Sequence, residues 1–226
     1  MTTTNPGNVK IRSAEIMRAN TAVLNDVNLH ITAGAVHAFI GPNGAGKSSL
    51  LKAIAGDIAC DAVTISGIDI SGTTVKELAA LRAVVRPHHR PQFGYAVTDV
   101  VSWANRDAHV GTILEQLGIE FLANRSISTL SSGQLAKVNL ACALAQNSDV
   151  IIADEPEAAL DPQARIDMWS HLVASHRTVV VATHALDLVM EFATNVTAIV
   201  DGHISFTKKT SDTSLSELRS LFSSSQ

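Results

Sequence analysis

The chain has 226 residues, of which 46% are hydrophobic and 17% charged, and its formal net charge at pH 7 is −4. This composition supports a packed core and excludes wholesale disorder. The acidic balance argues against a protein that coats nucleic acid. No apolar run reaches the ~18 residues that a membrane helix needs, and the N-terminal stretch lacks the apolar core of a secretory signal. We therefore expect a soluble cytoplasmic protein that reaches a membrane only through a partner.

Two cysteines, Cys60 and Cys142, are too few and too widely separated for a disulfide framework or a zinc pattern. We expect both to be buried thiols in a reducing compartment.

Short apolar segments alternate with helical patterns along the chain. Val27, Leu29 and Ile31 alternate with polar residues, which predicts a half-buried strand. Further strands are expected at 35–40, 62–66, 82–85, 149–154 and 178–183. Helices are expected from about residue 47, over 97–122, over 135–145, from 162, from about 185 and over 213–222.

Some details of these elements follow from individual residues. Asp161 and Pro162 match an N-cap and the first position of a helix, and Asp201-Gly202 predicts a hairpin turn within 198–206. The apolar faces of two helices are expected from their periodicity. The first face consists of Leu135, Val138, Cys142 and Ala145, and the second of Ile166, Trp169, Leu172 and Val173.

The order of the elements predicts the fold class. Strands that alternate with helices indicate an α/β domain with a mostly parallel sheet. The stretch from about 86 to 145 is rich in helical pattern and is expected to form a lobe inserted into that domain. We therefore expect a single domain over residues 1–226.

Residues 41–49 read GPNGAGKSS and match G-x-x-x-x-G-K-[ST] between a strand and a helix. The glycines let the backbone turn around an anion, and amides at the helix N-terminus point toward it. Lys47 would place its charge on the β- and γ-phosphates, and the Ser48 hydroxyl would ligate Mg²⁺. The alternative is a glycine-rich turn that only starts a helix. The expected nucleotide-binding residues are Asn43, Gly44, Ala45, Gly46, Lys47, Ser48 and Ser49.

Two acids and a histidine follow buried strands. Asp154 ends the strand at 149–154 and would bind Mg²⁺, while Glu155 would orient and polarise the attacking water. His184 follows the strand at 178–183, and the carboxyl ends of parallel strands meet at one edge, so its imidazole could donate to the γ-phosphate. The alternative for all three is a solvated side chain at a strand end. The catalytic candidates are Lys47, Glu155 and His184.

Four segments stand in order along the chain: GPNGAGKSS, LSSGQ, IIADEPEAALD and ATH. With them the chain resembles the nucleotide-binding subunit of ATP-binding cassette (ABC) transporters, from about residue 9 to about 206. The resemblance implies a P-loop NTPase core with a mostly parallel sheet, an N-terminal antiparallel β part and an inserted α-helical lobe. It also implies an ATPase that uses ATP and Mg²⁺ to drive transport.

The family works as a head-to-tail dimer in which each phosphate loop faces the signature segment of the other copy. The resemblance therefore implies that Ser131 and Gly133 complete the ATP site of a second copy, and that Asp161 belongs to the loop that links the two sites. Bare helix capping is the alternative for the signature residues. The implied partners are a second nucleotide-binding subunit, transmembrane permease subunits and an extracytoplasmic substrate-binding protein, at the cytoplasmic face of the membrane.

The chain departs from the family pattern at three places. The family signature is L-S-G-G-Q, and here Ser132 takes the place of the first glycine. Pro87 falls where the family has a Mg²⁺-contacting glutamine, and Gln92 is the nearby glutamine to which that role would pass. The family often stacks an aromatic residue on adenine in the zone that here reads IMRANTAVL, where Arg18 is the candidate for a cation–π contact.

The cargo is open at the level of the sequence. Residues 81–109 and 135–146 resemble the importer branch for haem, ferric siderophores and cobalamin, and in that branch a segment like the first lies at the permease docking surface. Iron-compound or haem import, another importer and an exporter are all retained. Two alternatives to a transporter motor are a soluble ABC ATPase of nucleic-acid repair or translation and a module that binds ATP without hydrolysing it.

Overall fold

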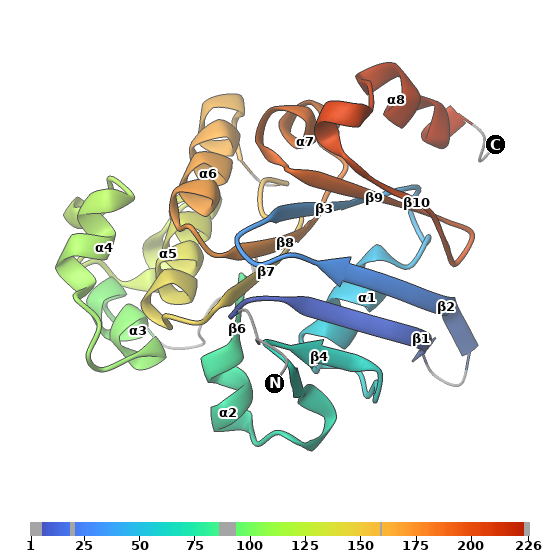
Figure 1. The fold of residues 1–226 in the computed structure, drawn as a ribbon. Coiled ribbons are helices and arrows are strands. Elements are labelled where there is room, and N and C mark those ends of the chain that lie inside the picture. The colour runs from blue at the N-terminus through green and yellow to red at the C-terminus, as the bar shows by residue number, and fades with distance from the viewer. Residues whose placement is uncertain (1–5, 19–20, 86–93, 159, 224–226) are drawn as a thin grey trace.

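The computed structural model describes residues 6–18, 21–85, 94–158 and 160–223. A central, mostly parallel sheet carries α3 to α7 on one side, and α1 with a smaller antiparallel sheet on the other (Figure 1). The α/β fold class with a mostly parallel sheet and an N-terminal antiparallel part is confirmed.

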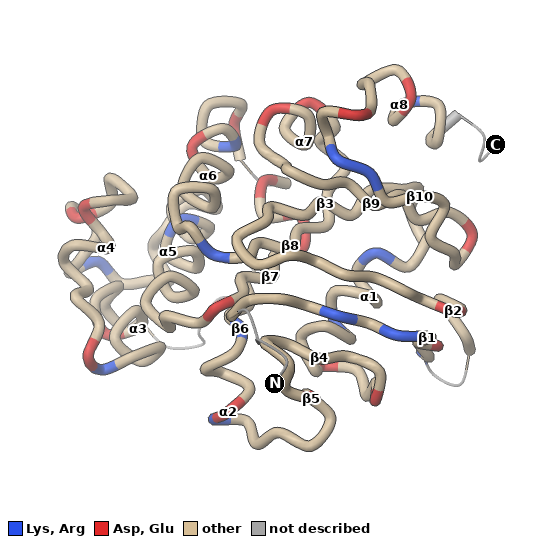
Figure 2. Tube along the Cα trace, viewed as in Figure 1, with Lys and Arg blue, Asp and Glu red and all other residues tan. Residues whose placement is uncertain are grey.

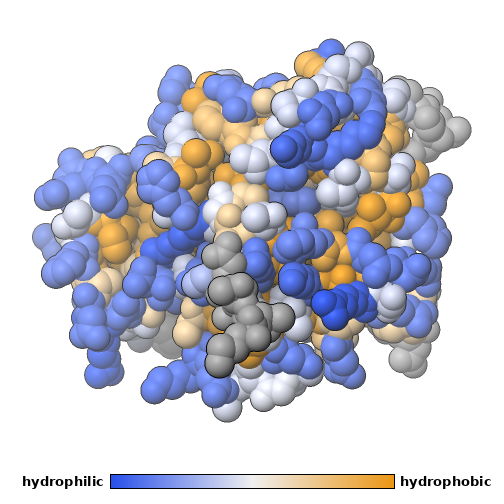
Figure 3. Space-filling view, viewed as in Figure 1, coloured by the Kyte–Doolittle hydropathy of each residue, from blue (hydrophilic) through white to orange (hydrophobic). Residues whose placement is uncertain are grey.

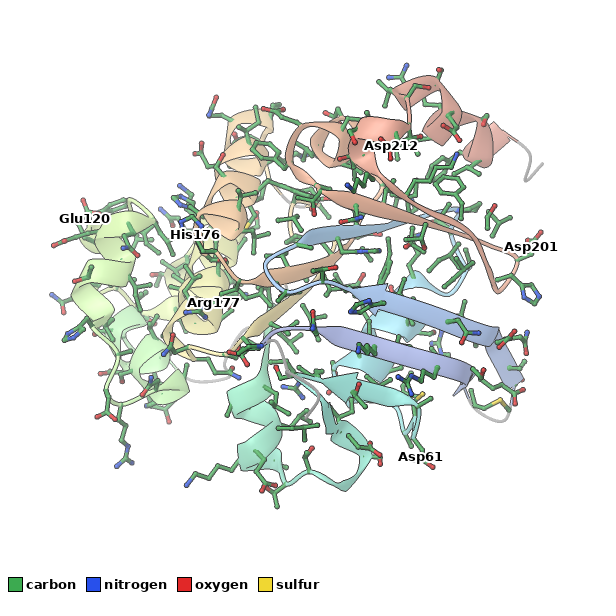
Figure 4. All side chains as sticks on the ribbon, viewed as in Figure 1. Asp61, Glu120, His176, Arg177, Asp201 and Asp212 are labelled. Carbon is green, nitrogen blue, oxygen red and sulfur yellow. The ribbon has the colours of Figure 1, made fainter. Side chains whose placement is uncertain are left out.

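The central sheet has six strands in the order β10-β9-β3-β8-β7-β6. Five of them are parallel, and β10 pairs with β9 in the antiparallel direction. The Asp201-Gly202 turn joins β9 to β10 as expected, and Asp201 is labelled at this turn in Figure 4. The strands are β3 (Val36–Ile40), β6 (Arg82–Val85), β7 (Val150–Asp154), β8 (Thr178–Ala182), β9 (Asn195–Val200) and β10 (His203–Lys209).

The antiparallel sheet has the order β2-β1-β4-β5. Its strand β1 was not expected, because three register shifts interrupt its pairing with β2 and Ser13 takes a positive φ of 47°. Val27, Leu29 and Ile31 are buried on β2, which confirms the half-buried strand. The strands are β1 (Val9–Arg18), β2 (Thr21–Ile31), β4 (Val63–Ile65) and β5 (Ile68–Asp69).

Eight helices are described. The α-helices are α1 (Lys47–Ile54), α2 (Val75–Leu81), α3 (Val97–Ala104), α4 (Val110–Gln116), α5 (Ser132–Ala145), α6 (Pro162–Ala174), α7 (Leu186–Phe192) and α8 (Leu215–Ser223). Short 3-10 turns lie at Ile70–Gly72, Glu120–Leu122, Ile127–Thr129 and Thr210–Asp212. The short helix α2 was missed, although Thr74 and Glu77 form a capping box at its start.

Two apolar clusters hold the layers together. One joins the antiparallel sheet, α1 and one face of the central sheet, and includes Ile16, Leu24 and Leu50. The other joins the opposite face of the central sheet to α3, α4, α5, α6 and α7, and includes Trp169. Because this second cluster runs without a break from the sheet into the helical segment, burial of both stabilises one connected core.

Three expectations about burial are wrong. Helix α5 is buried nearly all round rather than on one face, because it packs against α3, α4 and β6. On α6, Ile166 and Val173 are 38% and 40% exposed, and Met168 joins Trp169 and Leu172 in the core instead. Cys60 and Cys142 are free thiols that are only half-buried.

The surface is mixed in character. On the face shown in Figure 3, apolar residues lie among hydrophilic ones over the α4–α5 side and over the strands. Positive and negative residues are interspersed along the trace in Figure 2. Within the described ranges, no helix is long and apolar enough to cross a membrane.

Candidate functional site

Three loops meet at the carboxyl edge of the central sheet. Strands β3, β8 and β7 are neighbours in this order, and each ends at a segment that the sequence singled out. The loop after β3 contains the phosphate motif, His184 follows β8, and Asp154 and Glu155 end β7. The Thr183 N–H donates to the Phe39 carbonyl at 3.1 Å, and the Glu155 N–H donates to the Ala182 carbonyl at 2.8 Å. These bonds extend the ladders beyond the strands and fix the three loops relative to one another.

The phosphate loop depends on glycine at two positions. Gly41 has a φ of 145°, and a Cβ there would lie 2.0 Å from the Ile199 carbonyl oxygen. Gly46 has a φ of 108°, and a Cβ there would lie 2.8 Å from Leu24 Cγ. Strands β9 and β2 therefore press against the loop backbone from two sides, which leaves no room for a side chain at either position.

Lys47 is held inside the loop that it follows. Its Nζ donates to the Gly41 carbonyl at 2.7 Å and to the Pro42 carbonyl at 2.9 Å, and the residue is 6% exposed. Burial lowers the pKa of Lys47, while the negative charges of Glu155 and Asp154 oppose that shift. The loop thus encloses a cation whose nearest negative charges are the two acids at the end of β7.

Ser48 and Asp154 lie side by side. Ser48 Oγ donates to Asp154 Oδ1 at 3.2 Å, across 106 positions of sequence. A hydroxyl and a carboxylate are hard oxygen donors, and together they suit Mg²⁺, which takes its remaining ligands from water and phosphate. The pair predicted to hold the metal is therefore adjacent.

The other residues of the motif are either exposed at the tip of the loop or buried. Asn43 and Gly44 are exposed at the tip of the loop, and Ser49 is buried within α1. Ala45 is also buried, and its N–H donates to the Pro42 carbonyl at 3.3 Å. The tip therefore presents the exposed surface of the loop, while Ala45 and Ser49 face the interior.

Glu155 and His184 contact each other. His184 Nε2 lies 3.3 Å from Glu155 Oε1, and both side chains are about one-third to one-half exposed (34% and 44%). Burial lowers the pKa of His184 and the charge of Lys47 lowers it further, whereas Glu155 and Asp154 raise it. A neutral imidazole donates from Nε2 to the carboxylate. Glu155 itself has a positive φ of 47°, a strained conformation that the surrounding bonds maintain.

One residue of this edge escaped the sequence reasoning. Glu157 is 4% exposed and accepts hydrogen bonds from Thr183 Oγ1 and, at 3.3 Å, from Trp169 Nε1. Burial raises its pKa. The signal that could have found it is a second acid two residues after Glu155, directly before the apolar residues Ala158 and Leu160.

The signature residues lie at the start of α5. Ser131 is the N-cap, and it forms a capping box with Gln134: Gln134 N–H donates to Ser131 Oγ at 3.2 Å, and Ser131 N–H donates to Gln134 Oε1 at 3.1 Å. Ser131 and Ser132 are exposed. Gly133 lies beside Leu160, because a Cβ at residue 133 would be 3.6 Å from Leu160 Cδ2. Within one chain, Ser131 therefore acts as a helix cap.

Asp161 is likewise a helix cap, since its Oδ1 accepts from the Ala164 N–H at 3.0 Å and Pro162 follows it. Arg18 is exposed at the end of β1. Gln92 and Pro87 lie outside the described residues.

The fold and this edge define a P-loop nucleoside triphosphatase. The ABC transporter family matches residues 24–158. The hemin import ATP-binding protein HmuV of Streptomyces coelicolor is 35% identical over 198 residues, covering 80% of this chain and 71% of that protein. The phosphonates import ATP-binding protein PhnC 1 of Cupriavidus metallidurans is 31% identical over 239 residues, covering 92% and 84%.

A solved structure of an ATP binding subunit of an ABC transporter shares the fold, with a TM-score of 0.84 at 20% identity over 94% of this chain and 98% of that one. The chain therefore belongs to the ABC transporter family, and it is an ATPase of that family. The hemin import relative confirms the resemblance to the haem, siderophore and cobalamin importer branch, while the phosphonate relative lies outside that branch.

Proposed function

We propose that this chain is the ATP-hydrolysing motor subunit of a membrane importer that takes up haem or another iron compound. The observation that carries the motor assignment is the convergence of Lys47, the Ser48–Asp154 pair and the Glu155–His184 pair at one edge of the sheet. The hemin import relative supports the choice of cargo.

The chemistry assigned to this edge is phosphoryl transfer to water. Lys47 stabilises negative charge on the β- and γ-phosphates, and the amides at the start of α1 bind phosphate oxygens. Glu155 accepts a hydrogen bond from the attacking water and so orients it. We assign His184 to the γ-phosphate: its Nε2–H, which lies 3.3 Å from Glu155 Oε1, turns from that carboxylate to donate to the transferred group when nucleotide binds.

Ser48 and Asp154 would hold Mg²⁺ in this scheme. When bound, the metal neutralises charge on the phosphate oxygens. The hydrogen bond between the two side chains shows that both point into the same space, so a single cation can contact both.

The second half of the ATP site is assigned to another copy of the chain. Ser131 and Gly133 would contact the γ-phosphate held by the phosphate loop of the partner copy, and Asp161 would lie on the loop between the two sites. An exposed, capped N-terminus of the 14-residue helix α5 supports this role, because its free amides suit an anion. ATP would then favour the closed pair, and hydrolysis would loosen it.

A permease would receive the resulting motion at the cytoplasmic face of the membrane. An extracytoplasmic substrate-binding protein would deliver the cargo to that permease from the other side. Tyr95 and Trp103 support a docking surface there. Their rings form an edge-to-face pair with centroids 4.6 Å apart, and they are 41% and 57% exposed. Exposed aromatic groups of this kind are typical of protein interfaces. We assign Gln92, near this surface in sequence, to contact with the nucleotide site.

The same unbroken apolar cluster that links the sheet to α3–α6 supports treating residues 1–226 as a single ATPase domain with its helical lobe at about 86–145. The interspersed charges in Figure 2 favour a protein partner over nucleic acid.

A different importer is the second candidate, and the phosphonate relative, which aligns with 92% of the chain, favours it. To distinguish the two candidate functions, the wild-type chain is replaced by the Lys47→Ala variant in the cells that encode it. Uptake of labelled haem, ferric siderophore, cobalamin and phosphonate is then compared. Lys52→Ala, on the exposed side of α1, is the matched control.

We expect Lys47→Ala to abolish uptake of haem or another iron compound and to leave phosphonate uptake unchanged, with Lys52→Ala behaving as the wild type. Loss of phosphonate uptake alone would assign the second candidate. Normal uptake of every compound in the Lys47→Ala cells, or co-sedimentation of the purified chain with ribosomes or DNA, would contradict a motor role.

A further inference from the structure

A buried carboxyl group lies directly behind the site. Among the residues that the structure describes, Glu157 is the one buried acidic residue, and it is 4% exposed. Each of its two oxygens accepts a hydrogen bond from a different part of the chain, the turn after β8 in one case and α6 in the other.

The first bond fixes the turn that carries His184. Thr183 Oγ1 donates to Glu157 Oε1 and at the same time accepts from the Ala185 N–H at 2.9 Å. Thr183 is fully buried, and its N–H is bonded to Phe39. The backbone is therefore held on both sides of His184, by Thr183 and by Ala185, and Glu157 determines how the Thr183 hydroxyl is oriented.

The second bond ties this arrangement to α6. Trp169 Nε1 donates to Glu157 Oε2, and the Trp169 ring is fully buried and packs beside Phe192 of α7. Helix α6 begins at the cap Asp161, four residues after Glu157. One carboxylate thus joins the loop after β7, the turn after β8 and the helix that follows Asp161.

The hydrogen-bonding pattern, as the structure has it, suits a group that accepts at both of its polar atoms. Both neighbours donate, so an ionised carboxylate satisfies both, and the two bonds offset the cost of desolvating it. An amide of the same shape has one accepting oxygen and one donating nitrogen. Its oxygen would have to face Trp169, whose N–H can only donate, and its NH₂ would then face Thr183 and force that hydroxyl to accept instead of donate, which changes how Thr183 is oriented.

We propose that Glu157 is a positioning residue for ATP hydrolysis, which holds the turn at residues 183–185, and with it His184, in register with Glu155 and α6. This inference rests on the proposed function and adds to it a residue that touches neither substrate nor metal. Glu157 acts through Thr183, whereas Glu155 and His184 meet the reacting groups.

The test uses the full chain and compares Glu157→Gln with three other variants. Thr183→Val removes the hydroxyl at nearly constant volume, and Thr183→Ser restores it. Glu191→Gln changes an exposed acid on α7 and is the matched control. ATP turnover is measured at pH 8 with Mg²⁺, alongside the melting temperature of each variant.

We expect Glu157→Gln and Thr183→Val each to lower kcat about 10-fold while KM for ATP stays within about 2-fold, since the loss is confined to the transition state. Thr183→Ser and Glu191→Gln should stay within about 2-fold of the wild type. The Glu157→Gln/Thr183→Val double variant should be about as slow as either single variant, because both remove the same link.

A spectroscopic measurement separates positioning from general stabilisation. The imidazole ¹H–¹³C cross-peak of His184, assigned by its loss in His184→Gln, should shift in Glu157→Gln, while that of the exposed His203 stays in place. A folded Glu157→Gln chain with unchanged kcat, or with an unmoved His184 cross-peak, would overturn the proposal. If Glu157→Gln does not fold, Thr183→Val provides the same two measurements.

Failure of the proposed function gives a different result. In that case the wild-type chain itself would not turn over ATP under any condition. The cross-peak of His184 would still decide whether Glu157 positions the imidazole.

Discussion

The two halves of the proposed ATP site are built in different ways. At the phosphate-loop edge, each key polar group has a partner within the chain: Lys47 with loop carbonyls, Ser48 with Asp154, and Glu155 with His184. At the start of α5, Ser131 is exposed, and the hydrogen bonds described for it are local, with Gln134 and Leu135 of the same helix. The parallel sheet assembles the first half from segments far apart in sequence, whereas the second half is a short local motif that presents its surface outward.

The outward half is nevertheless connected to the rest of the chain. Gly133 lies against Leu160, directly before the Asp161 cap of α6, and α6 is bonded through Trp169 to Glu157. A partner copy that meets the signature segment would therefore also meet the loop at residues 155–161. In the proposed dimer, this contact would couple nucleotide occupancy at one ATP site to the structure of the other.

The largest expected effect tests the half that is complete within one chain. Glu155→Gln keeps the shape of the side chain and removes its charge, so ATP turnover should fall by roughly 10²–10³-fold, the range seen when a transition-state group is removed. Nucleotide affinity should be retained, because Lys47 and the loop amides are untouched, and the closed dimer should accumulate. Single-turnover hydrolysis measures the loss of turnover, and size-exclusion chromatography with ATP measures accumulation of the closed dimer. Near-normal turnover in Glu155→Gln would remove Glu155 from the mechanism.

The second prediction concerns the strand that supports the phosphate loop. His37 of β3 is 1% exposed, and its Nε2 lies 2.7 Å from Thr197 Oγ1, which bonds in turn to Thr207. Burial lowers the pKa of His37 to about 4. Because the unfolded chain binds this proton near pH 6.5, the contribution of His37 to stability is complete above pH 6.5 and is lost as the pH falls toward 4.

The loss at pH 4.5 relative to pH 7.5 should be about 2.5 kcal/mol, measured as the extra fall in the free energy of unfolding of the wild type over that of His37→Gln. Urea denaturation at the two pH values gives both numbers. His203→Gln, on exposed β10, should show the same pH dependence as the wild type. Parallel pH dependence in wild type and His37→Gln would show that the buried imidazole takes up a proton without penalty.

The placement of residues at the phosphate-loop edge could be predicted because these residues follow strongly apolar strands. Asp154 ends β7 and His184 follows β8, each a strand of five buried or nearly buried residues, and the carboxyl ends of parallel strands share an edge with Lys47. The elements that were missed or mispredicted have weaker sequence patterns. Strand β1 has register shifts, and the exposed Ile166 and Val173 of α6 matched helical spacing without facing the core.

Glu157 could not be assigned from the sequence because its partners, Thr183 and Trp169, are 26 and 12 positions away and come together only through the tertiary fold. The opposite applies to the signature segment. Its capping box is local and readable, but its role beyond capping depends on a second chain, on which one sequence carries no direct information.

The third prediction tests that dependence. Gly133→Ala should fold normally, because residue 133 is helical and the new Cβ would meet Leu160 at an ordinary 3.6 Å. If Gly133 faces the phosphates of a partner copy, the methyl group obstructs that approach, and ATP turnover should fall about 10-fold. Thermal denaturation confirms folding, and Gly111→Ala, on exposed α4 with open space around it, is the control.

Mixing two slow variants makes the test specific for a shared site. A dimer of one Lys47→Ala copy and one Gly133→Ala copy carries both lesions at one ATP site and none at the other. An equal mixture should therefore regain up to roughly a quarter of wild-type turnover, since half of the dimers are mixed and each has one intact site. No recovery in a mixture shown to exchange subunits would place Gly133 in the site of its own chain.

The smallest effect is expected at Ser132, where the signature departs from the family. Ser132 is the exposed first residue of α5, and the cap is supplied by Ser131 and Gln134, so Ser132→Gly should cost less than about 1 kcal/mol of stability. ATP turnover should stay within about 3-fold of the wild type or rise, because the backbone gains room to approach a phosphate. Ser131→Ala, which removes the cap, should cost about 1 kcal/mol. A roughly 10²-fold loss of turnover in Ser132→Gly, the size of losing one transition-state donor, would instead show that the hydroxyl binds the substrate. The outward half would then be specialised in this chain rather than weakened.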